Sequence, residues 1–170
     1  MHNRLIIYST TDGQTKLICE RIKNFSKFNN QTKIISINEV MKENLSSYET
    51  IIIGASIRYG KHNPFVFNFV KENLKILNNK KSVFFSVNVV ARKAEKNLPE
   101  NNPYIIKFLK LTNWNPDKKA VFAGKIDYPK YSFFDRQIIR LIMFITKGPT
   151  DTSKSYEFTE WSKVDDFARE

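Results

Sequence analysis

The apolar and polar residues form two kinds of segment that alternate along most of the chain. Short continuous apolar runs are typical of parallel strands covered on both faces, and longer segments with apolar residues at helical spacing indicate helices. The predicted strands span Arg4–Ser9, Thr32–Ile37, Thr50–Ala55, Lys81–Val90 and Lys119–Gly124. The predicted helices span Gln14–Phe28, Asn63–Leu77, Pro103–Leu111 and Thr159–Arg169. This alternation predicts an α/β fold with a parallel sheet between two layers of helices.

One segment, residues 125–155, breaks the alternation and is too long for a simple turn. It contains a short predicted helix at Phe133–Thr146, which is apolar on nearly all sides and gathers Arg136, Arg140 and Lys147 on one face. This helix is too short to span a bilayer, but it could lie in the interface with its basic residues against anionic headgroups. The alternative is that it packs on the edge of the sheet.

The composition bounds the class of protein. The chain has 170 residues, which we interpret as one domain over 1–170, and a formal net charge of +11. The charge favours an anionic partner, although a bias in genome base composition can produce the same excess. One cysteine and two histidines argue against a disulfide and a histidine-based metal site. Without a secretory signal, the protein is expected in the cytosol or on the cytosolic face of a membrane.

The first strand leads into a loop that suits a phosphate group. The stretch "STTDGQT" offers several hydroxyls, a glycine that permits close backbone approach, and the N–H groups of the helix that follows. It matches neither the P-loop nor the dinucleotide-binding pattern. The alternative is an ordinary capped helix start. The residues concerned are Ser9, Thr10, Thr11, Asp12, Gly13, Gln14 and Thr15, of which Asp12 is expected to point outward or to cap the helix.

Two further loops follow strand ends at the same edge of the predicted sheet, where α/β proteins bind ligands. "GASIRYGKHNP" presents Arg58, Tyr59 and Gly60 as a wall suited to a planar ring, and "SVNVVARK" ends its strand with Ser86 and Asn88. Taken alone, the first stretch could equally be an ordinary loop, and the second could be a simple strand end. Together with the first loop they predict a site for flavin mononucleotide (FMN).

Several of these motifs resemble known proteins. "IIYSTTDGQT" resembles the phosphate loop of flavodoxins. The ordered set "IIGASIRYG", "SVNVVARK", "YPKYSFFDR", "LIM" and "TDT" resembles the flavodoxin-like, menaquinone-dependent protoporphyrinogen oxidases of bacterial haem synthesis. The resemblance covers nearly the whole chain, from Arg4 to Arg169.

The resemblance implies a flavodoxin-like three-layer sandwich with a five-stranded parallel sheet, order 2-1-3-4-5, and a long-chain insertion that splits the last strand. It implies noncovalent FMN and oxidation of protoporphyrinogen IX to protoporphyrin IX with a membrane quinone (menaquinone or ubiquinone) as acceptor. It also implies peripheral attachment to the anionic surface of the inner membrane, on its cytoplasmic side.

The same resemblance assigns residues to parts of the cofactor, and names no catalytic side chain. Ser9 to Thr15 would hold the phosphate. The residues that would flank the isoalloxazine are Ala55, Ser56, Ile57, Arg58, Tyr59, Gly60, Ser86, Val87, Asn88, Val89, Val90 and Ala91. Thr150, Asp151 and Thr152 would lie in the last flavin-proximal segment. Basic residues near the ring are candidates for the substrate's propionates. They are Arg58, Arg92, Lys93, Lys125 and Lys130.

Two alternatives of other classes remain. A flavodoxin-type electron carrier or another FMN quinone reductase would share the site, but carriers of this kind tend to be acidic and dock on basic partners, unlike this basic chain. A nucleic-acid-binding module would use the positive charge. However, the chain lacks a known motif and a face of basic and aromatic residues, so no nucleic acid is expected as a partner. The sequence does not predict the oligomeric state.

Overall fold

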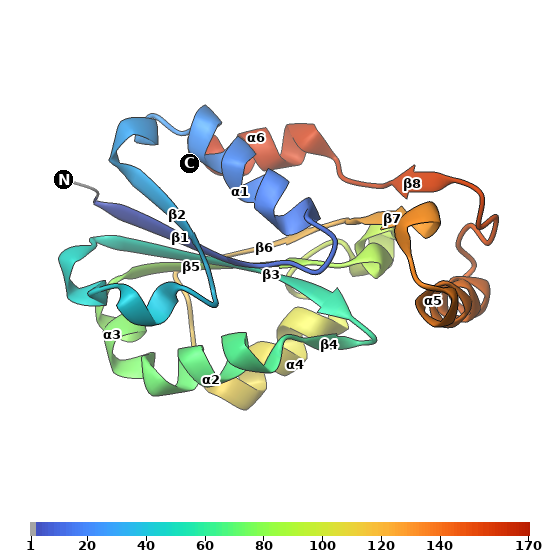
Figure 1. Ribbon diagram of the computed structural model, residues 1–170. Coiled ribbons are helices and arrows are strands. Elements are labelled where there is room, and N and C mark those ends of the chain that lie inside the picture. Colours follow the sequence, from blue (N-terminus) through green and yellow to red (C-terminus); the bar gives the residue numbers. More distant parts are fainter. Residues whose placement is uncertain (1–2) are drawn as a thin grey trace.

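The central element of the protein is a parallel β-sheet with its strands out of sequence order. The computed structural model describes residues 3–170 (Figure 1). The parallel strands are β1 (Arg4–Ser9), β2 (Thr32–Ser36), β3 (Thr50–Arg58), β5 (Lys81–Val87) and β6 (Lys118–Phe122). They lie in the order β2-β1-β3-β5-β6. Numbered among themselves, they run 2-1-3-4-5, which confirms the predicted fold class and strand order.

Helices cover both faces of the sheet. Helices α1 (Gln14–Phe25) and α6 (Trp161–Arg169) lie on one face, and α2 (Pro64–Glu72), α3 (Leu74–Asn79) and α4 (Pro103–Thr112) lie on the other (Figure 1). Successive side chains of β1 show why both layers are needed. Leu5 and Ile7 belong to one hydrophobic cluster and Ile6 to another, and all three are fully buried. A strand buried on both faces reads as a continuous apolar run.

The second predicted helix is interrupted. The pattern predicts one helix over Asn63–Leu77, but α2 ends before Asn73 and α3 begins after it. The side-chain amide of Asn73 donates to the carbonyl of Phe69 at 2.9 Å, and its backbone N–H donates to the same carbonyl at 3.1 Å. Asparagine competes in this way with the regular helical pattern, which explains the break.

The third strand is longer than predicted and turns back on itself. It runs beyond Ala55 to Arg58, and the short strand β4 (Lys61–His62) pairs with it antiparallel. The two turn residues, Tyr59 and Gly60, both have positive φ, at 50° and 76°. Two successive positive φ values are typical of a tight two-residue hairpin. The loop predicted after this strand is therefore a β-hairpin.

The next strand is shorter than predicted. The pattern extends it to Val90, but it ends at Val87. The Asn88 side chain accepts a hydrogen bond from the backbone N–H of Ala91 and starts a 3₁₀ helix there. The 3₁₀ helices of the described residues lie at Asn29–Gln31, Val40–Lys42, Leu45–Ser47, Val89–Arg92, Ala94–Lys96 and Tyr128–Lys130.

The predicted insertion is present, but it follows the last parallel strand and does not split it. Strand β6 is continuous, and the chain then leaves the sheet as β7 (Lys125–Asp127), which pairs antiparallel with the returning strand β8 (Ser155–Glu157). Between them lies α5 (Phe133–Ile145), which projects from the body of the molecule (Figure 1). A small cluster of buried residues holds the insertion together. Its members are Ile126, Tyr128, Tyr131 and Met143.

Most of the apolar surface of α5 is exposed. Of its residues, only Met143 is buried, while Phe134 and Phe144 are 78% and 73% exposed. The alternative that α5 simply packs on the sheet edge therefore accounts for a minor part of its apolar surface. Among residues 3–170, no helix combines the length and apolar character that crossing a bilayer requires.

Candidate functional site

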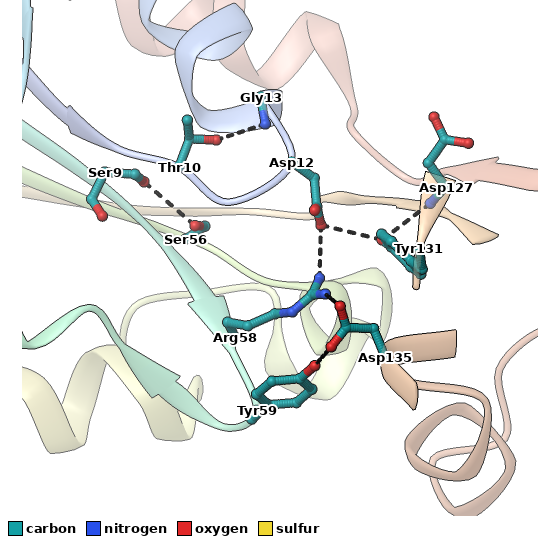
Figure 2. Close-up of polar contacts among 10 residues, drawn as sticks. All are labelled: Ser9, Thr10, Asp12, Gly13, Ser56, Arg58, Tyr59, Asp127, Tyr131 and Asp135. Carbon is teal, nitrogen blue, oxygen red and sulfur yellow. Dashed lines mark hydrogen bonds and ion pairs between the residues drawn. The ribbon is translucent and has the colours of Figure 1, made fainter. Parts of the chain in front are cut away.

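The loop between β1 and α1 makes a tight turn at Gly13. Gly13 has a φ of +89°, a left-handed conformation that glycine adopts without steric cost. Its backbone N–H donates to the Thr10 hydroxyl at 3.0 Å (Figure 2). A Cβ on Gly13 would meet no atom within 4 Å, so the backbone conformation, and not lack of space, favours glycine here. The loop thus places hydroxyls and the start of a twelve-residue helix at one point.

Thr15 carries a buried hydroxyl without a partner. Among residues 3–170, only Thr15 Oγ1 and Arg136 Nε are buried side-chain polar atoms with no hydrogen bond. Thr15 is fully buried, and it lines a small cavity of about 40 Å³ together with Thr10, Thr11 and Ser56. An unsatisfied buried hydroxyl costs roughly 1–3 kcal/mol. An acceptor in this cavity, such as a phosphate oxygen, would remove that cost, so the loop fits the predicted phosphate.

Asp12 also lines this cavity, but its carboxylate is paired with residues of other elements. Its carboxylate lies 3.0 Å from Arg58 Nη1 and accepts a hydrogen bond from Tyr131 at 3.2 Å (Figure 2). It makes no cap on α1, which has no side-chain N-cap hydrogen bond. Burial raises the pKa of Tyr131 to about 12, so this phenol remains a donor at neutral pH. The loop's one negative charge is therefore neutralised by a neighbouring element.

The other two predicted loops come together beside the first. The hairpin residues Ile57–Gly60 and the segment Asn88–Val90 line a common cavity of about 110 Å³, which we call the ring cavity. Ala55 and Ser86 are fully buried and Ala91 is nearly so, and none of the three lines this cavity. The Ser56 hydroxyl donates to the Ser9 carbonyl at 3.4 Å, which ties the hairpin to the phosphate loop (Figure 2). Val87 lines the small cavity with Thr15.

The structure does not bring the last predicted segment to either cavity. Thr150, Asp151 and Thr152 line neither of them. Asp151 instead accepts hydrogen bonds from the hydroxyl and the backbone N–H of Ser153, which lower its pKa to about 2.

The insertion supplies a side of the ring cavity that the sequence did not predict. Tyr131, Ile139, Ile142, Met143 and Thr146 line it from the insertion, and Tyr104 lines it from α4. The helical spacing of 139, 142, 143 and 146 was a signal for one common face, but nothing in the sequence showed what that face covers.

Asp135 joins α5 to the hairpin. Its carboxylate lies 3.4 Å from Arg58 Nη2 and accepts a hydrogen bond from the Tyr59 hydroxyl (Figure 2). The Tyr59 hydrogen bond, followed by one from Ser132, lowers the pKa of Asp135. Arg58 therefore bridges two carboxylates from different parts of the chain.

Most of the predicted propionate-binding residues have partners within the protein. Besides Arg58, Arg92 donates to the carbonyls of Val89 and Thr146 and so holds the end of α5. Lys125 and Lys130 lie 3.7 Å and 3.1 Å from Asp127. Lys93 makes no ion pair within residues 3–170.

Neither metal nor thiol chemistry is indicated in the part of the chain that the structure describes. Residues 3–170 contain no group of three or more metal-ligating side chains. Cys19 on α1 is fully buried, and burial raises the pKa of its thiol, which makes it a packing residue.

An open parallel sheet of this order, with a hydroxyl-lined loop after its first strand and a cavity beside that loop, defines the flavodoxin class of α/β proteins. A profile of the flavodoxin domain matches residues 5–153, and the chain belongs to that family.

Two similar proteins extend over nearly the whole chain. A protein from Escherichia coli named protoporphyrinogen IX dehydrogenase (quinone) is 41% identical over 167 residues, which cover 98% of this chain and 92% of that protein. A protein of the same name from Leishmania major is 42% identical, with 96% of this chain and 72% of that protein covered.

Solved structures show the same fold at low identity. Oxidised flavodoxin 1 from Bacillus cereus has a TM-score of 0.51 at 14% identity and covers 97% of this chain and 93% of its own. A flavoprotein in complex with FMN from Lactobacillus acidophilus has a TM-score of 0.50 at 14% identity, with 71% and 93% covered.

Proposed function

We propose that this protein binds FMN and oxidises protoporphyrinogen IX to protoporphyrin IX, with a quinone as electron acceptor. The observation that carries the cofactor assignment is the buried, unpartnered Thr15 hydroxyl in a loop next to the ring cavity. Near-full-length similarity to proteins named protoporphyrinogen IX dehydrogenase (quinone) supports the particular reaction.

The phosphate of FMN would be held by hydroxyls and backbone amides. Thr10, Thr11 and Thr15 supply the hydroxyls, and the first turn of α1 supplies free N–H groups and the positive end of its dipole. The guanidinium of Arg58 is occupied by Asp12 and Asp135, and Lys125, which lines the small cavity, lies 3.7 Å from Asp127. Hydroxyls and a helix N-terminus suffice for a phosphate, as in other nucleotide-binding loops.

The isoalloxazine would lie in the ring cavity. Its walls would be the hairpin Ile57–Gly60 on one side and Asn88–Val90 on the other. Bound FMN would supply the redox chemistry, and the protein's part would be to bind and orient the reactants and to exclude water. The insertion serves the last purpose, because Ile139 and Met143 close the cavity with apolar side chains.

We further propose that α5 lies in the interface of an anionic membrane, on the cytoplasmic side of the inner membrane. One face of α5 covers the ring cavity. Its other apolar side chains are largely exposed: Phe133, Phe134, Phe144 and Ile145, at 68%, 78%, 73% and 70%. Exposed apolar side chains with basic neighbours are typical of interfacial helices. A membrane-dissolved quinone would then be close to the site.

The test is spectroscopic. The purified protein is examined for flavin absorbance, and menadione and protoporphyrinogen IX are then added anaerobically while porphyrin fluorescence is followed. Flavin bands with quinone-dependent porphyrin formation are expected. Flavin bands without porphyrin would support the electron carrier or another quinone reductase instead, and no flavin after reconstitution with FMN would overturn the cofactor assignment.

A further inference from the structure

A second cavity lies between β4, α2 and α4. Its volume is about 320 Å³, and its walls are mostly aromatic and aliphatic: His62, Pro64, Phe67, Tyr104, Phe108 and Leu111. We call it the groove. Gly60 and Tyr104 line both the groove and the ring cavity, so one turn of the hairpin and one tyrosine lie between the two. Apart from Gly60, no residue assigned to the cofactor lines the groove.

The groove wall also carries Lys61, Lys107 and the Tyr104 hydroxyl, and its one imidazole is that of His62. This ring packs edge-on against Phe108 at a centroid distance of 4.9 Å, and its Nε2 lies 3.0 Å from the Ser86 hydroxyl. Burial lowers the pKa of His62 to about 4, so the imidazole is neutral at physiological pH. A neutral imidazole has one donor and one acceptor nitrogen, and its neighbours decide which is which.

The neighbours of Ser86 assign the tautomer. The Asn88 side-chain oxygen accepts from the backbone N–H of Ala91 at 3.2 Å, which fixes the orientation of that amide. Its nitrogen therefore donates to Ser86 Oγ, at 3.1 Å. Ser86 Oγ has no other acceptor among residues 3–170, so its hydroxyl proton is directed to His62 Nε2, and the ring proton resides on Nδ1. Within residues 3–170, the contact with Ser86 is the one hydrogen bond that the His62 ring makes. The Nδ1–H group therefore remains available as a donor.

This hydrogen-bonded chain connects the two cavities. Asn88 lines the ring cavity, Ser86 is fully buried between, and His62 lines the groove. Burying polar side chains in a row is costly unless each is satisfied, and the buried atoms of this hydrogen-bonded chain all have partners. Nδ1 at the groove end has no partner within residues 3–170 and is not among the buried atoms, so it remains accessible to a ligand. A carbonyl-bearing ligand in the groove would accept a hydrogen bond from Nδ1–H and so complete the hydrogen-bonded chain.

We propose that the groove binds the ring of the quinone, with His62 Nδ1–H donating to a quinone carbonyl. The inference rests on the proposed function, in which a quinone is the acceptor. Phe67, Tyr104 and Phe108 offer flat apolar surfaces to a flat ring. The groove takes a compact ring system better than a four-ring macrocycle, so the two substrates would have separate places, on opposite sides of the hairpin turn.

The direct test is the imidazole signal of His62. The chain has two histidines, so in a His2→Gln background His62 is the single source of imidazole ¹H–¹⁵N signals. The FMN-loaded, oxidised protein is titrated with menadione. A saturable shift of the His62 ring signals is expected, with the Nδ1 proton moving most. Signals that stay in place at saturating menadione would overturn the proposal.

A pair of variants on α4 separates the groove from the ring cavity. Leu111 lines the groove and is 54% exposed, whereas Ile106 is 46% exposed on the same helix and lines neither cavity. Leu111→Trp should weaken the menadione titration by about tenfold or more, as the loss of ring contacts in a filled site does. Ile106→Trp should leave it unchanged. A shift retained in full by Leu111→Trp would mean that menadione acts from the ring cavity, which would overturn the proposal.

The kinetic readout keeps this inference distinct from the proposed function. In Leu111→Trp, the KM for menadione should rise about tenfold while flavin content and the KM for protoporphyrinogen IX stay at the wild-type values. If the wild type forms porphyrin with menadione but Leu111→Trp has an unchanged KM, the groove assignment alone fails. If the wild type forms no porphyrin, the proposed function fails, whatever the His62 signals show.

Discussion

Arg58 Nη1 lies 3.0 Å from the carboxylate of Asp12, which joins the end of β3 to the loop that follows β1 (Figure 2). The second nitrogen of the same guanidinium lies 3.4 Å from Asp135 on α5. One side chain therefore holds the phosphate loop, the hairpin and the insertion in a fixed relation. The position of α5 over the ring cavity is thus coupled to the loop proposed to hold the cofactor.

Arg58→Met should loosen this arrangement. Methionine keeps much of the apolar stem but leaves Asp12 and Asp135 without their shared cation, so α5 should separate from the hairpin more often. We expect faster proteolysis within residues 125–155 and an FMN dissociation constant raised by no more than about fivefold, since partly exposed ion pairs contribute little each. Limited proteolysis and a flavin fluorescence titration measure the two effects.

Lys130→Met is the matched control for Arg58→Met. Lys130 is also a basic residue paired with an aspartate, at 3.1 Å from Asp127, but it bridges no second element and its side chain is 79% exposed. It should leave both readouts at the wild-type values. Equal proteolysis of Arg58→Met and the wild type would show that the hydrophobic cluster around Met143 holds α5 without help.

Replacing Thr15 by valine should stabilise the protein without FMN and weaken its binding of FMN. Thr15→Val keeps the shape of the side chain and removes the unpartnered hydroxyl. Without FMN, the variant should be more stable by about 1 kcal/mol, because no buried donor is left unsatisfied. With FMN, its affinity should fall by about tenfold, the loss of one hydrogen bond to a charged group. Urea unfolding and flavin titration give the two numbers.

Thr15→Ser tests whether the hydroxyl itself is responsible. It retains the donor and should keep most of the FMN affinity, despite the small loss of the buried methyl group. An affinity for FMN that is unchanged in Thr15→Val would remove this residue from the proposed phosphate site. A weaker apoprotein would mean that the hydroxyl has a partner, such as an ordered water, in solution.

The sequence predicted the parallel sheet and its loops well because each depends on local patterns. The central parallel strands contain continuous apolar runs such as Ile51–Ile53, and the phosphate loop is a compact cluster of hydroxyls with Gly13. The carboxyl ends of such strands meet at one edge of the sheet whatever the details of the fold. The strand pattern alone therefore predicts that the two walls of the ring cavity lie side by side.

The rest depended on contacts between residues distant in sequence. Nothing near Arg58 indicates that it will meet Asp12 and Asp135, which lie 46 positions before it and 77 positions after it along the chain. Strand β7 has three residues, too few for a period to be visible. The tight hairpin had a signal in Gly60 at the second turn position, but tyrosine with positive φ at the first is uncommon, which hid it.

The exposed face of α5 should determine membrane binding. Phe134→Ser with Phe144→Ser removes two largely exposed aromatic side chains that line neither cavity. The double variant should bind anionic phospholipid vesicles much more weakly, because burying a side chain of this size contributes about 1.5–3 kcal/mol. Sedimentation with phosphatidylglycerol vesicles measures the bound fraction.

Met41→Ser is the control for this experiment. Met41 is 79% exposed in a 3₁₀ helix far along the chain from the insertion, so its loss changes exposed apolar area without changing α5. It should leave vesicle binding unchanged. Ile142 is avoided in the test because it lines the ring cavity, where a change could alter flavin binding as well. Unchanged sedimentation of the double serine variant would exclude this face as the anchor.

His62 should make the stability of the protein fall in mild acid. Its pKa is about 4 in the folded protein, because burial disfavours the charged imidazole, and about 6.5 in the unfolded chain. Between these values the unfolded chain binds a proton that the folded protein does not, so the free energy of unfolding decreases as the pH falls from 6.5 towards 4. The slope from this residue should approach about 1.4 kcal/mol per pH unit.

Urea unfolding at pH 7 and pH 5 measures this slope. The variant His62→Gln, which cannot titrate, should lose correspondingly less stability between the two pH values. The same loss in His62→Gln as in the wild type would mean that the ring is accessible to protons in the folded protein, and that its place between Ser86 and the groove is less enclosed than the packing against Phe108 indicates.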